Sequence, residues 1–235
     1  MIDLNGKVVL VTGATGALGS ATAQVFANAN ARLALTGRNK EKLEDIASRL
    51  DAETLNIPCD LSDINEVDAL VNKAVDHYGS LDILLNIAGG FSMGPKVHEL
   101  SQNDFESMFS MNFTSALNTC NKVIPQMIRQ GSGHVVNVSA RAGTQGKAKM
   151  APYCISKSAL ITLTESLADE QKSTDINVNC ILPGTIDTET NRNDMPNADY
   201  STWVPPEDIA NTMLFLCSPL AHSISGAVIP VYGKS

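Results

Sequence analysis

The sequence predicts an α/β fold, a doubly wound parallel sheet of about seven strands with helices on both faces. Short apolar runs alternate with longer segments of helical spacing along the chain, and this alternation is typical of parallel sheets. A glycine-rich turn directly follows the first apolar run. The chain has 235 residues, 43% of them hydrophobic, so we expect residues 1–235 to form a single domain with a buried core.

The expected elements follow one another in regular order. Strands are predicted at the apolar runs Lys7–Val11, Arg32–Thr36, Thr54–Pro58, Leu81–Asn86, His134–Ser139, Asn177–Leu182 and Ala227–Val231. The intervening segments predict helices over Ala17–Ala29, Lys40–Leu50, Asp63–Tyr78, Ser101–Arg129, Pro152–Lys172 and Pro206–Cys217. In Asp63–Tyr78 the apolar residues recur at intervals of three and four, which is helical spacing. The segment Asp187–Trp203 lacks a clear period.

Charge and cysteine usage narrow the class of protein. A net charge of −8 argues against a nucleic-acid surface, since phosphate backbones attract an excess of Lys and Arg. The five cysteines are scattered without C-x-x-C spacing, which predicts no metal or redox framework and fits a reducing cytosol. The sequence has no signal-peptide pattern and no apolar run long enough to span a bilayer. We therefore expect a cytoplasmic protein with no metal, membrane or nucleic-acid partner.

The glycine-rich turn spells T-G-A-T-G-A-L-G from Thr12 to Gly19, between a predicted strand and a predicted helix. Gly13 permits a tight turn, and the small residues allow a pyrophosphate to approach the backbone. The amino terminus of the following helix offers free N–H groups and the positive end of its dipole. This context favours a dinucleotide site; the alternative is an ordinary glycine-rich strand-to-helix turn.

A second motif, Y-C-I-S-K, places Tyr153 and Lys157 four residues apart, on one face of a predicted helix. A carbonyl that accepts a hydride also needs a proton, and a free phenol has a pKa of roughly 10. A neighbouring ammonium group favours the phenolate and lowers that pKa. A phosphate cradle combined with such an acid suggests hydride chemistry on a nucleotide cofactor.

Six segments, which follow one another along the chain in the family's order, resemble motifs of the short-chain dehydrogenase/reductase family. The turn resembles T-G-x-x-x-G-x-G, with Ala17 in place of the middle glycine, and Asn86–Gly89 resembles N-N-A-G, with Ile87 in place of the second Asn. The other four are Cys59-Asp60-Leu61, the asparagine Asn112, the Tyr153–Lys157 pair, and Pro183–Thr188, which resembles P-G-x-[IV]-x-T. The resemblance covers nearly the whole chain and implies a Rossmann-like fold, a nicotinamide cofactor and the interconversion of a carbonyl and an alcohol.

The resemblance also implies roles for individual residues. Tyr153 is the expected acid, Lys157 its helper and a partner of the nicotinamide ribose, and Asn112 the holder of a water. Asp60 is expected at the adenine, although it also fits a helix cap, and Thr188 at the nicotinamide carboxamide. The expected cofactor-binding residues are Gly13, Thr15, Gly16, Leu18, Gly19, Arg38, Asp60, Leu61, Asn86, Ala88, Gly89, Tyr153, Lys157, Pro183, Gly184, Thr185 and Thr188.

Cofactor choice depends on the residues after the second predicted strand. NAD enzymes place Asp or Glu there to bind the ribose 2′-hydroxyl, but this sequence has Gly37 followed by Arg38. A guanidinium group suits the 2′-phosphate of NADP, so NADP is predicted over NAD. The alternative is that Arg38 is a solvated turn residue.

One position departs from the family pattern. The family's catalytic serine lies thirteen residues before the tyrosine and three before a glycine, and both counts reach Ala140, one residue after Ser139. Three interpretations remain open. Ser139 reorients and serves as the fourth catalytic residue, or Arg141 or Thr144 supplies the donor, or the site lacks this donor and the enzyme is slow, since one such donor contributes roughly 10²–10³ in rate.

The sequence therefore predicts an NADP(H)-dependent oxidoreductase for a small carbonyl or alcohol. A reductase of 3-oxoacyl-acyl-carrier-protein or of a pterin-like ring is an alternative, and a catalytically weak nucleotide-sensing or scaffold protein is an alternative of another class. We expect a short substrate lid at about 187–203 and a homodimer or homotetramer, since isologous contacts are common. Candidate residues for these two features are Arg141, Met150, Arg192 and Trp203 in the pocket and Met111, Phe113 and Leu117 at the subunit contact.

Overall fold

The structure is a computed structural model that describes residues 2–234. Within that range seven parallel strands form one sheet, in the order β3-β2-β1-β4-β5-β6-β7. They are β1 (Val8–Val11), β2 (Arg32–Gly37), β3 (Thr54–Pro58), β4 (Ile83–Asn86), β5 (Ser132–Val138), β6 (Asp175–Pro183) and β7 (Val228–Val231). The predicted doubly wound α/β fold is confirmed.

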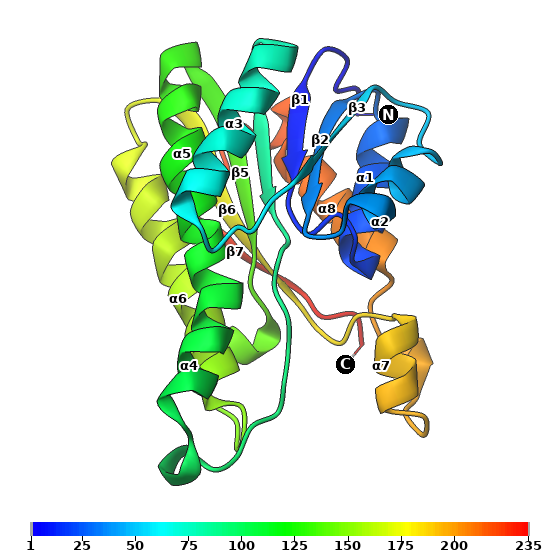
Figure 1. The fold of residues 1–235 in the computed structure, drawn as a ribbon, viewed down its shortest axis with the longest axis vertical. Coiled ribbons are helices and arrows are strands. Elements are labelled where there is room, and N and C mark those ends of the chain that lie inside the picture. Colours follow the sequence, from blue (N-terminus) through cyan, green and yellow to red (C-terminus); the bar gives the residue numbers. More distant parts are fainter. Residues whose placement is uncertain (1, 235) are drawn as a thin grey trace.

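Helices cover both faces of this sheet (Figure 1). Alternate residues of a strand point to opposite faces, and in β1 Val9 and Val11 pack into one core while Val8 and Leu10 pack into the other. The first core includes residues of α1 (Ala17–Asn28), α2 (Lys40–Ala47) and α8 (Pro206–Leu216). The second includes residues of α3 (Ile64–Tyr78), α5 (Ser115–Gln130) and α6 (Ala151–Glu170).

The expected helix at Ser101–Arg129 is interrupted. It consists of α4 (Gln102–Phe109), a π-helical turn at Ser110–Thr114, and α5. The wider turn contains buried Asn112, whose amide hydrogen-bonds both backbone groups of Gly90 at 3.0 Å. Periodicity alone does not reveal the break, because π turns are single insertions that often occur at functional sites.

The segment without a clear period also contains structure. It includes α7 (Glu189–Asp194) and a 3₁₀ turn at Tyr200–Thr202. The Thr188 side chain caps α7 by accepting a hydrogen bond from the Asn191 N–H at 3.1 Å. An N-cap of this kind allows a helix too short to show an apolar period.

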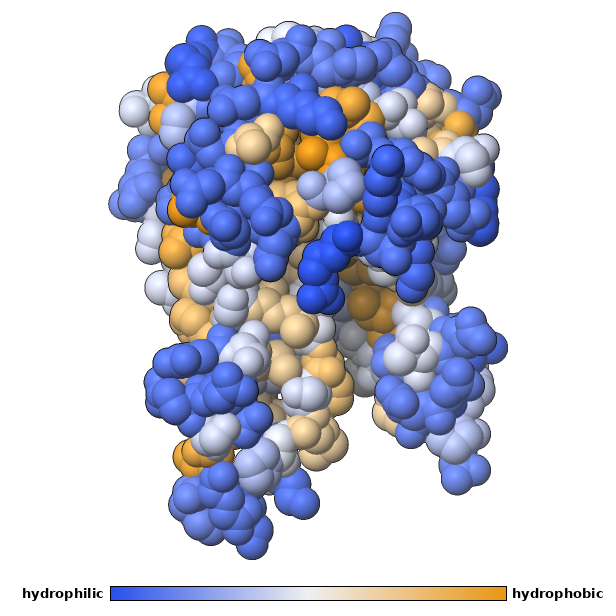
Figure 2. All heavy atoms as spheres, viewed as in Figure 1, coloured by the Kyte–Doolittle hydropathy of each residue, from blue (hydrophilic) through white to orange (hydrophobic). Residues whose placement is uncertain are grey.

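The strands all end at the lower edge of the sheet in Figure 1, where α4 and α7 project beyond it. Figure 2 shows the surface hollowed between these two projections. In a parallel sheet, ligands bind in the crevice outside the carboxyl ends of the strands. No helix among residues 2–234 is long and apolar enough to cross a membrane.

Candidate active site

The glycine turn between β1 and α1 leaves no room for a side chain at Gly13 or at Gly19. Gly13 has a positive φ of 64°, and a Cβ there would lie 2.8 Å from the Ala88 Cα. A Cβ at Gly19 would overlap the Gly13 carbonyl oxygen. The first turn of α1 contains no acidic residue, and its N-cap, Gly16, makes no side-chain cap. This helix amino terminus therefore fits a phosphate group.

Thr12 holds this turn against the loop after β4. Its buried hydroxyl accepts hydrogen bonds from the N–H groups of Ile87 at 2.9 Å and Ala88 at 3.0 Å, and donates to the Leu85 carbonyl at 3.1 Å. Sequence reasoning gave Thr12 no role, although it opens the glycine motif. One hydroxyl thus fixes the distance between the phosphate cradle and the Ala88–Gly89 backbone.

At the far end of the cradle, Arg38 and Asp60 follow β2 and β3 and are both exposed. The Asp60 carboxylate accepts hydrogen bonds from the Ser62 hydroxyl at 2.7 Å and N–H at 2.9 Å. These bonds, with a smaller contribution from nearby Arg38, lower the pKa of Asp60. Asp60 thus holds the loop before α3 through Ser62, while the cap of α3 is Asp63, which accepts from Asn65 N–H at 2.8 Å.

Asn86 lies inside the protein at the end of β4. Its amide donates to Asn137 Oδ1 at 2.9 Å and accepts from the Thr119 hydroxyl at 2.7 Å. Asn137 in turn donates to the Thr164 hydroxyl at 2.9 Å. This buried network links β4, β5, α5 and α6, and satisfied networks of this kind specify a unique core. The buried Asn86 side chain therefore joins these four elements beneath the proposed site.

Tyr153, Lys157 and Asn112 come together at the loop after β4. A Cβ at Gly89 would lie 2.6 Å from Asn112 Oδ1 and 3.2 Å from Lys157 Nζ, so both polar atoms meet the backbone of Gly89. Tyr153 lies one helical turn before Lys157 on α6, and its ring packs edge-on against Phe91 with 5.0 Å between centroids.

Burial sets the proton affinities of this pair. It raises the pKa of Tyr153 to about 12, because a buried phenolate loses its hydration. It lowers the pKa of Lys157 to about 8 for the same reason applied to an ammonium group. The Lys157 side chain donates to the Val138 carbonyl at 2.9 Å.

Ser139 is joined to the same lysine. Its hydroxyl donates to the Lys157 carbonyl at 2.7 Å, and Ser139 is only 3% exposed. A Cβ at Gly143 would lie 2.8 Å from this hydroxyl and 3.0 Å from the Lys157 carbonyl, so the glycine makes room for the contact. Ala140 follows with extended backbone (φ −162°, ψ 161°), and its side chain points to the other side of the strand.

The segment after β6 forms the opposite wall of the hollow. Gly184 N–H donates to the Val231 carbonyl at 2.9 Å, and Thr188 begins α7 as its cap. Asp187 binds Arg192 at 2.6 Å, and the Arg192 guanidinium lies 4.9 Å from the centre of the Tyr200 ring. The structure therefore keeps this short segment ordered by its own contacts.

The buried ammonium of Lys157 generates a prediction about stability. Below the folded pKa of about 8 the protonated lysine destabilises the fold by up to about 3 kcal/mol, and this cost disappears as pH rises toward the unfolded pKa. Lys157→Met should therefore raise the free energy of unfolding at pH 7, while the gap between variant and parent narrows above pH 9. Urea denaturation at both pH values measures this gap; a variant less stable than the parent at pH 7 would contradict it.

A family model and the similar relatives reported below point to the same family. The sequence model described as short chain dehydrogenase matches residues 7–199. An uncharacterized oxidoreductase of Staphylococcus haemolyticus is 33% identical over 224 residues, covering 94% of this chain and 95% of that protein. An uncharacterized oxidoreductase of Staphylococcus aureus strain MW2 is 32% identical over 227 residues, with the same coverage. The chain therefore belongs to the short-chain dehydrogenase family of oxidoreductases.

Proposed function

We propose that this chain is an NADP(H)-dependent reductase of small carbonyl compounds that also runs in the alcohol-oxidising direction. The observation that carries the proposal is the meeting of Lys157 Nζ and Asn112 Oδ1 at Gly89, one helical turn from the Tyr153 phenol. The strand-to-helix turn supports a dinucleotide, because Cβ atoms at Gly13 and Gly19 would clash with the backbones of Ala88 and Gly13 in this tight turn, and because α1 begins with no acidic residue and no side-chain cap. When bound, the nicotinamide supplies or accepts the hydride.

The residues of this chain would then handle the proton. Tyr153 donates its phenolic proton to the carbonyl oxygen as negative charge develops there. A pKa of about 12 is too high for efficient transfer near neutral pH, so positive charge must come close to the phenol. At its place in the structure the Lys157 ammonium does not offset this shift, so the positive charge of an oxidised nicotinamide would have to favour the phenolate. Pro183, Gly184, Thr185 and Thr188 are proposed to border the nicotinamide.

We further propose a cytoplasmic location and a homodimer or homotetramer. All five cysteines are buried and free of disulfides, which suits a reducing compartment. The competing scaffold or sensor function is favoured only by Ala140, and an acyl-carrier-protein or pterin substrate has no specific contact in its favour. Residues 187–203 are proposed as the substrate lid.

Arg38 should choose the cofactor. Gly37 leaves no carboxylate at the end of β2, so the ribose 2′-phosphate meets a guanidinium and no repelling charge. Arg38→Ala should weaken NADPH binding at least about tenfold and change NADH binding little. Fluorescence titration of each cofactor measures this, with Lys42→Ala as the neighbouring cation control. Equal dissociation constants for the two cofactors in the parent chain would contradict the prediction.

Tyr153 should be required for turnover but not for cofactor binding. Tyr153→Phe removes one hydroxyl and keeps the ring that packs against Phe91, so NADPH affinity should stay within about twofold. NADPH oxidation with a panel of ketones should fall below about a tenth of the parent rate. Residual turnover above that level would mean that another acid donates the proton.

A serine at position 140 should restore the hydrogen-bond donor to the substrate carbonyl that Ala140 lacks. Ser139 donates its one proton to the Lys157 carbonyl, so the interpretation without a serine donor is favoured. Ala140→Ser should raise ketone reduction, by at most roughly 10²–10³. Ser139→Ala should weaken NADPH binding through Lys157, without separately reducing carbonyl polarisation. A fall in turnover in Ser139→Ala with unchanged cofactor affinity would instead support Ser139 as the polarising donor.

Exposed apolar side chains in the π turn, α5 and α6 support the oligomer. Met111 is 45% exposed, Ile128 50% and Ile155 47%, and they belong to the helical stretch from α4 to α5 and to α6. Light scattering at micromolar concentration should give a dimer or tetramer, and Met111→Lys with Ile155→Lys should shift the mass toward a monomer. A parent chain that is only monomeric would refute the assembly.

A further inference from the structure

An uncharged, largely apolar segment follows β4 beside the proposed site. From Ile87 to Pro95 the sequence contains no charged side chain, and the segment passes Gly89, where the two polar atoms of the proposed site meet. Phe91 is 56% exposed and Met93 is 61% exposed. Ligand sites are lined mainly by apolar and aromatic side chains, so this pair of exposed side chains beside the proposed acid is a candidate substrate contact.

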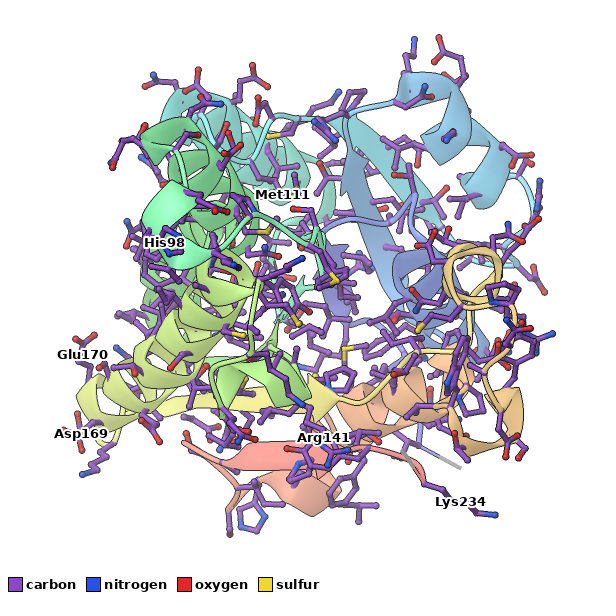
Figure 3. The ribbon with its side chains drawn as sticks, turned by 90° about the horizontal axis from the view of Figure 1, so that it is seen from below. His98, Met111, Arg141, Asp169, Glu170 and Lys234 are labelled. Carbon is purple, nitrogen blue, oxygen red and sulfur yellow. The ribbon has the colours of Figure 1, made fainter. Side chains whose placement is uncertain are left out.

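Hydrogen bonds tie this segment to the site on both sides of the exposed pair. Gly90 N–H donates to Asn112 Oδ1, and the Asn112 amide donates to the Gly90 carbonyl, both at 3.0 Å. Gly94 N–H donates to the Lys149 carbonyl at 2.9 Å, two residues before α6 begins. Figure 3, which views this edge of the sheet from below, shows His98, in the 3₁₀ turn that follows the segment, at the outside of the molecule. The two apolar side chains are therefore held between the asparagine of the site and the start of the helix that contains the proposed acid.

The Phe91 ring contacts the proposed acid directly. Its centroid lies 5.0 Å from that of Tyr153, with an angle of 79° between the ring planes. Burial, and to a smaller extent the Cys154 thiol, raise the pKa of Tyr153, and within residues 2–234 no charged side chain adds to this shift. The surroundings of the phenol are therefore apolar, and more than half of the Phe91 side chain is left open to a ligand.

Such a surface favours an uncharged ring over a polar or charged group. Covering the exposed part of Phe91 removes apolar area from water, which is favourable. Aromatic side chains attract further rings in edge-on or offset arrangements, and the flexible thioether of Met93 adapts to the shape of what it covers. A charged group in the same place would lose its hydration without gaining a partner.

We propose that the substrate is an uncharged ketone with an apolar ring beside its carbonyl, and that Phe91 determines this specificity by packing against the ring. This inference rests on the proposed function and names its substrate class. To accept the proton, the carbonyl oxygen has to lie within hydrogen-bond distance of the Tyr153 hydroxyl. Because Phe91 packs against that same phenol, it is the side chain that a ring on the carbonyl carbon meets, and Met93 extends the same surface.

The test measures NADPH-dependent reduction of acetophenone, cyclohexyl methyl ketone and butanone. Each ketone is compared with itself in parent and variant, so that differences in intrinsic reactivity cancel. Phe91→Ala should lower kcat/KM for the two ring ketones about tenfold more than for butanone. The loss should lie in KM, with kcat within about twofold, because the contact is present before and during hydride transfer. Phe91→Tyr, which keeps the ring, should retain the preference, and Phe91→Leu should show part of the loss.

A matched variant and two further measurements separate substrate contact from other roles of the ring. Phe215→Ala removes another partly exposed phenylalanine, on α8, and should leave all three ketones unchanged. NADPH affinity of Phe91→Ala within about twofold of the parent reports an intact fold. An equal fall in kcat for all three ketones would overturn the proposal, because Phe91 would then only support the acid. A shift of the light-scattering mass toward a monomer in Phe91→Ala would also overturn it, by assigning the ring to a subunit contact.

Failure of this inference is distinguishable from failure of the proposed function. If ketones are reduced and Phe91→Ala affects all three alike, the substrate class is wrong while the reductase stands. If the parent chain reduces none of them, the proposed function fails, and calorimetric binding of acetophenone to NADP⁺-loaded Tyr153→Phe decides the contact by itself. Binding weakened about tenfold in the Tyr153→Phe, Phe91→Ala double variant supports the contact. No binding, or equal binding in the two variants, overturns it.

Discussion

Reciprocal hydrogen bonds between the end of β5 and the middle of α6 determine the geometry of the site. Lys157 donates from its side chain to the Val138 carbonyl, and Ser139 donates from its hydroxyl to the Lys157 carbonyl, at 2.9 and 2.7 Å. These two bonds fix the position of α6 relative to the end of β5. Both are buried, where hydrogen bonds are electrostatically stronger than in water. The position of Tyr153, one turn earlier on the same helix, follows from these two bonds.

Burying Lys157 in this contact lowers the stability of the fold, and we propose that the chemistry of the site requires it. Lys157 is 5% exposed, and its ammonium group donates to a backbone carbonyl and meets Asn112 at Gly89. Among residues 2–234 no carboxylate pairs with it. Such an arrangement is unfavourable for folding but keeps a positive charge available for chemistry. Tyr153 has the complementary property, because burial raises the pKa of its phenol to about 12. We propose that the two residues act as acid and activator, with the final pKa of each set by the cofactor that binds beside them.

The sequence predicts the parts of this protein that depend on repeated local patterns. Seven apolar runs, the helices between them and the glycine turn each follow from a period or from a residue with special backbone freedom. The π turn around Asn112 and the helix α7 do not, since a buried amide paired with Gly90 and a cap at Thr188 decide them. A sequence motif also does not show in which direction a side chain points.

Ser139 illustrates that last point. Its place in the sequence suits a catalytic hydroxyl displaced by one residue, and only the three-dimensional contact with Lys157 distinguishes a donor to substrate from a donor to the backbone. Asp60 is similar, since its place in the sequence suited a helix cap, whereas in the structure Asp63 caps α3 and Asp60 binds Ser62.

We propose that Tyr153 becomes the acid only when positive charge is brought to it. The most direct measurement follows ionisation of tyrosines labelled at Cζ by NMR, with Tyr153→Phe identifying the signal, across neutral and alkaline pH. Without cofactor, Tyr153 should remain protonated until the pH approaches its pKa of about 12. With NADP⁺ bound, the apparent pKa of Tyr153 should drop by several units. An identical pKa in the two states would contradict the account.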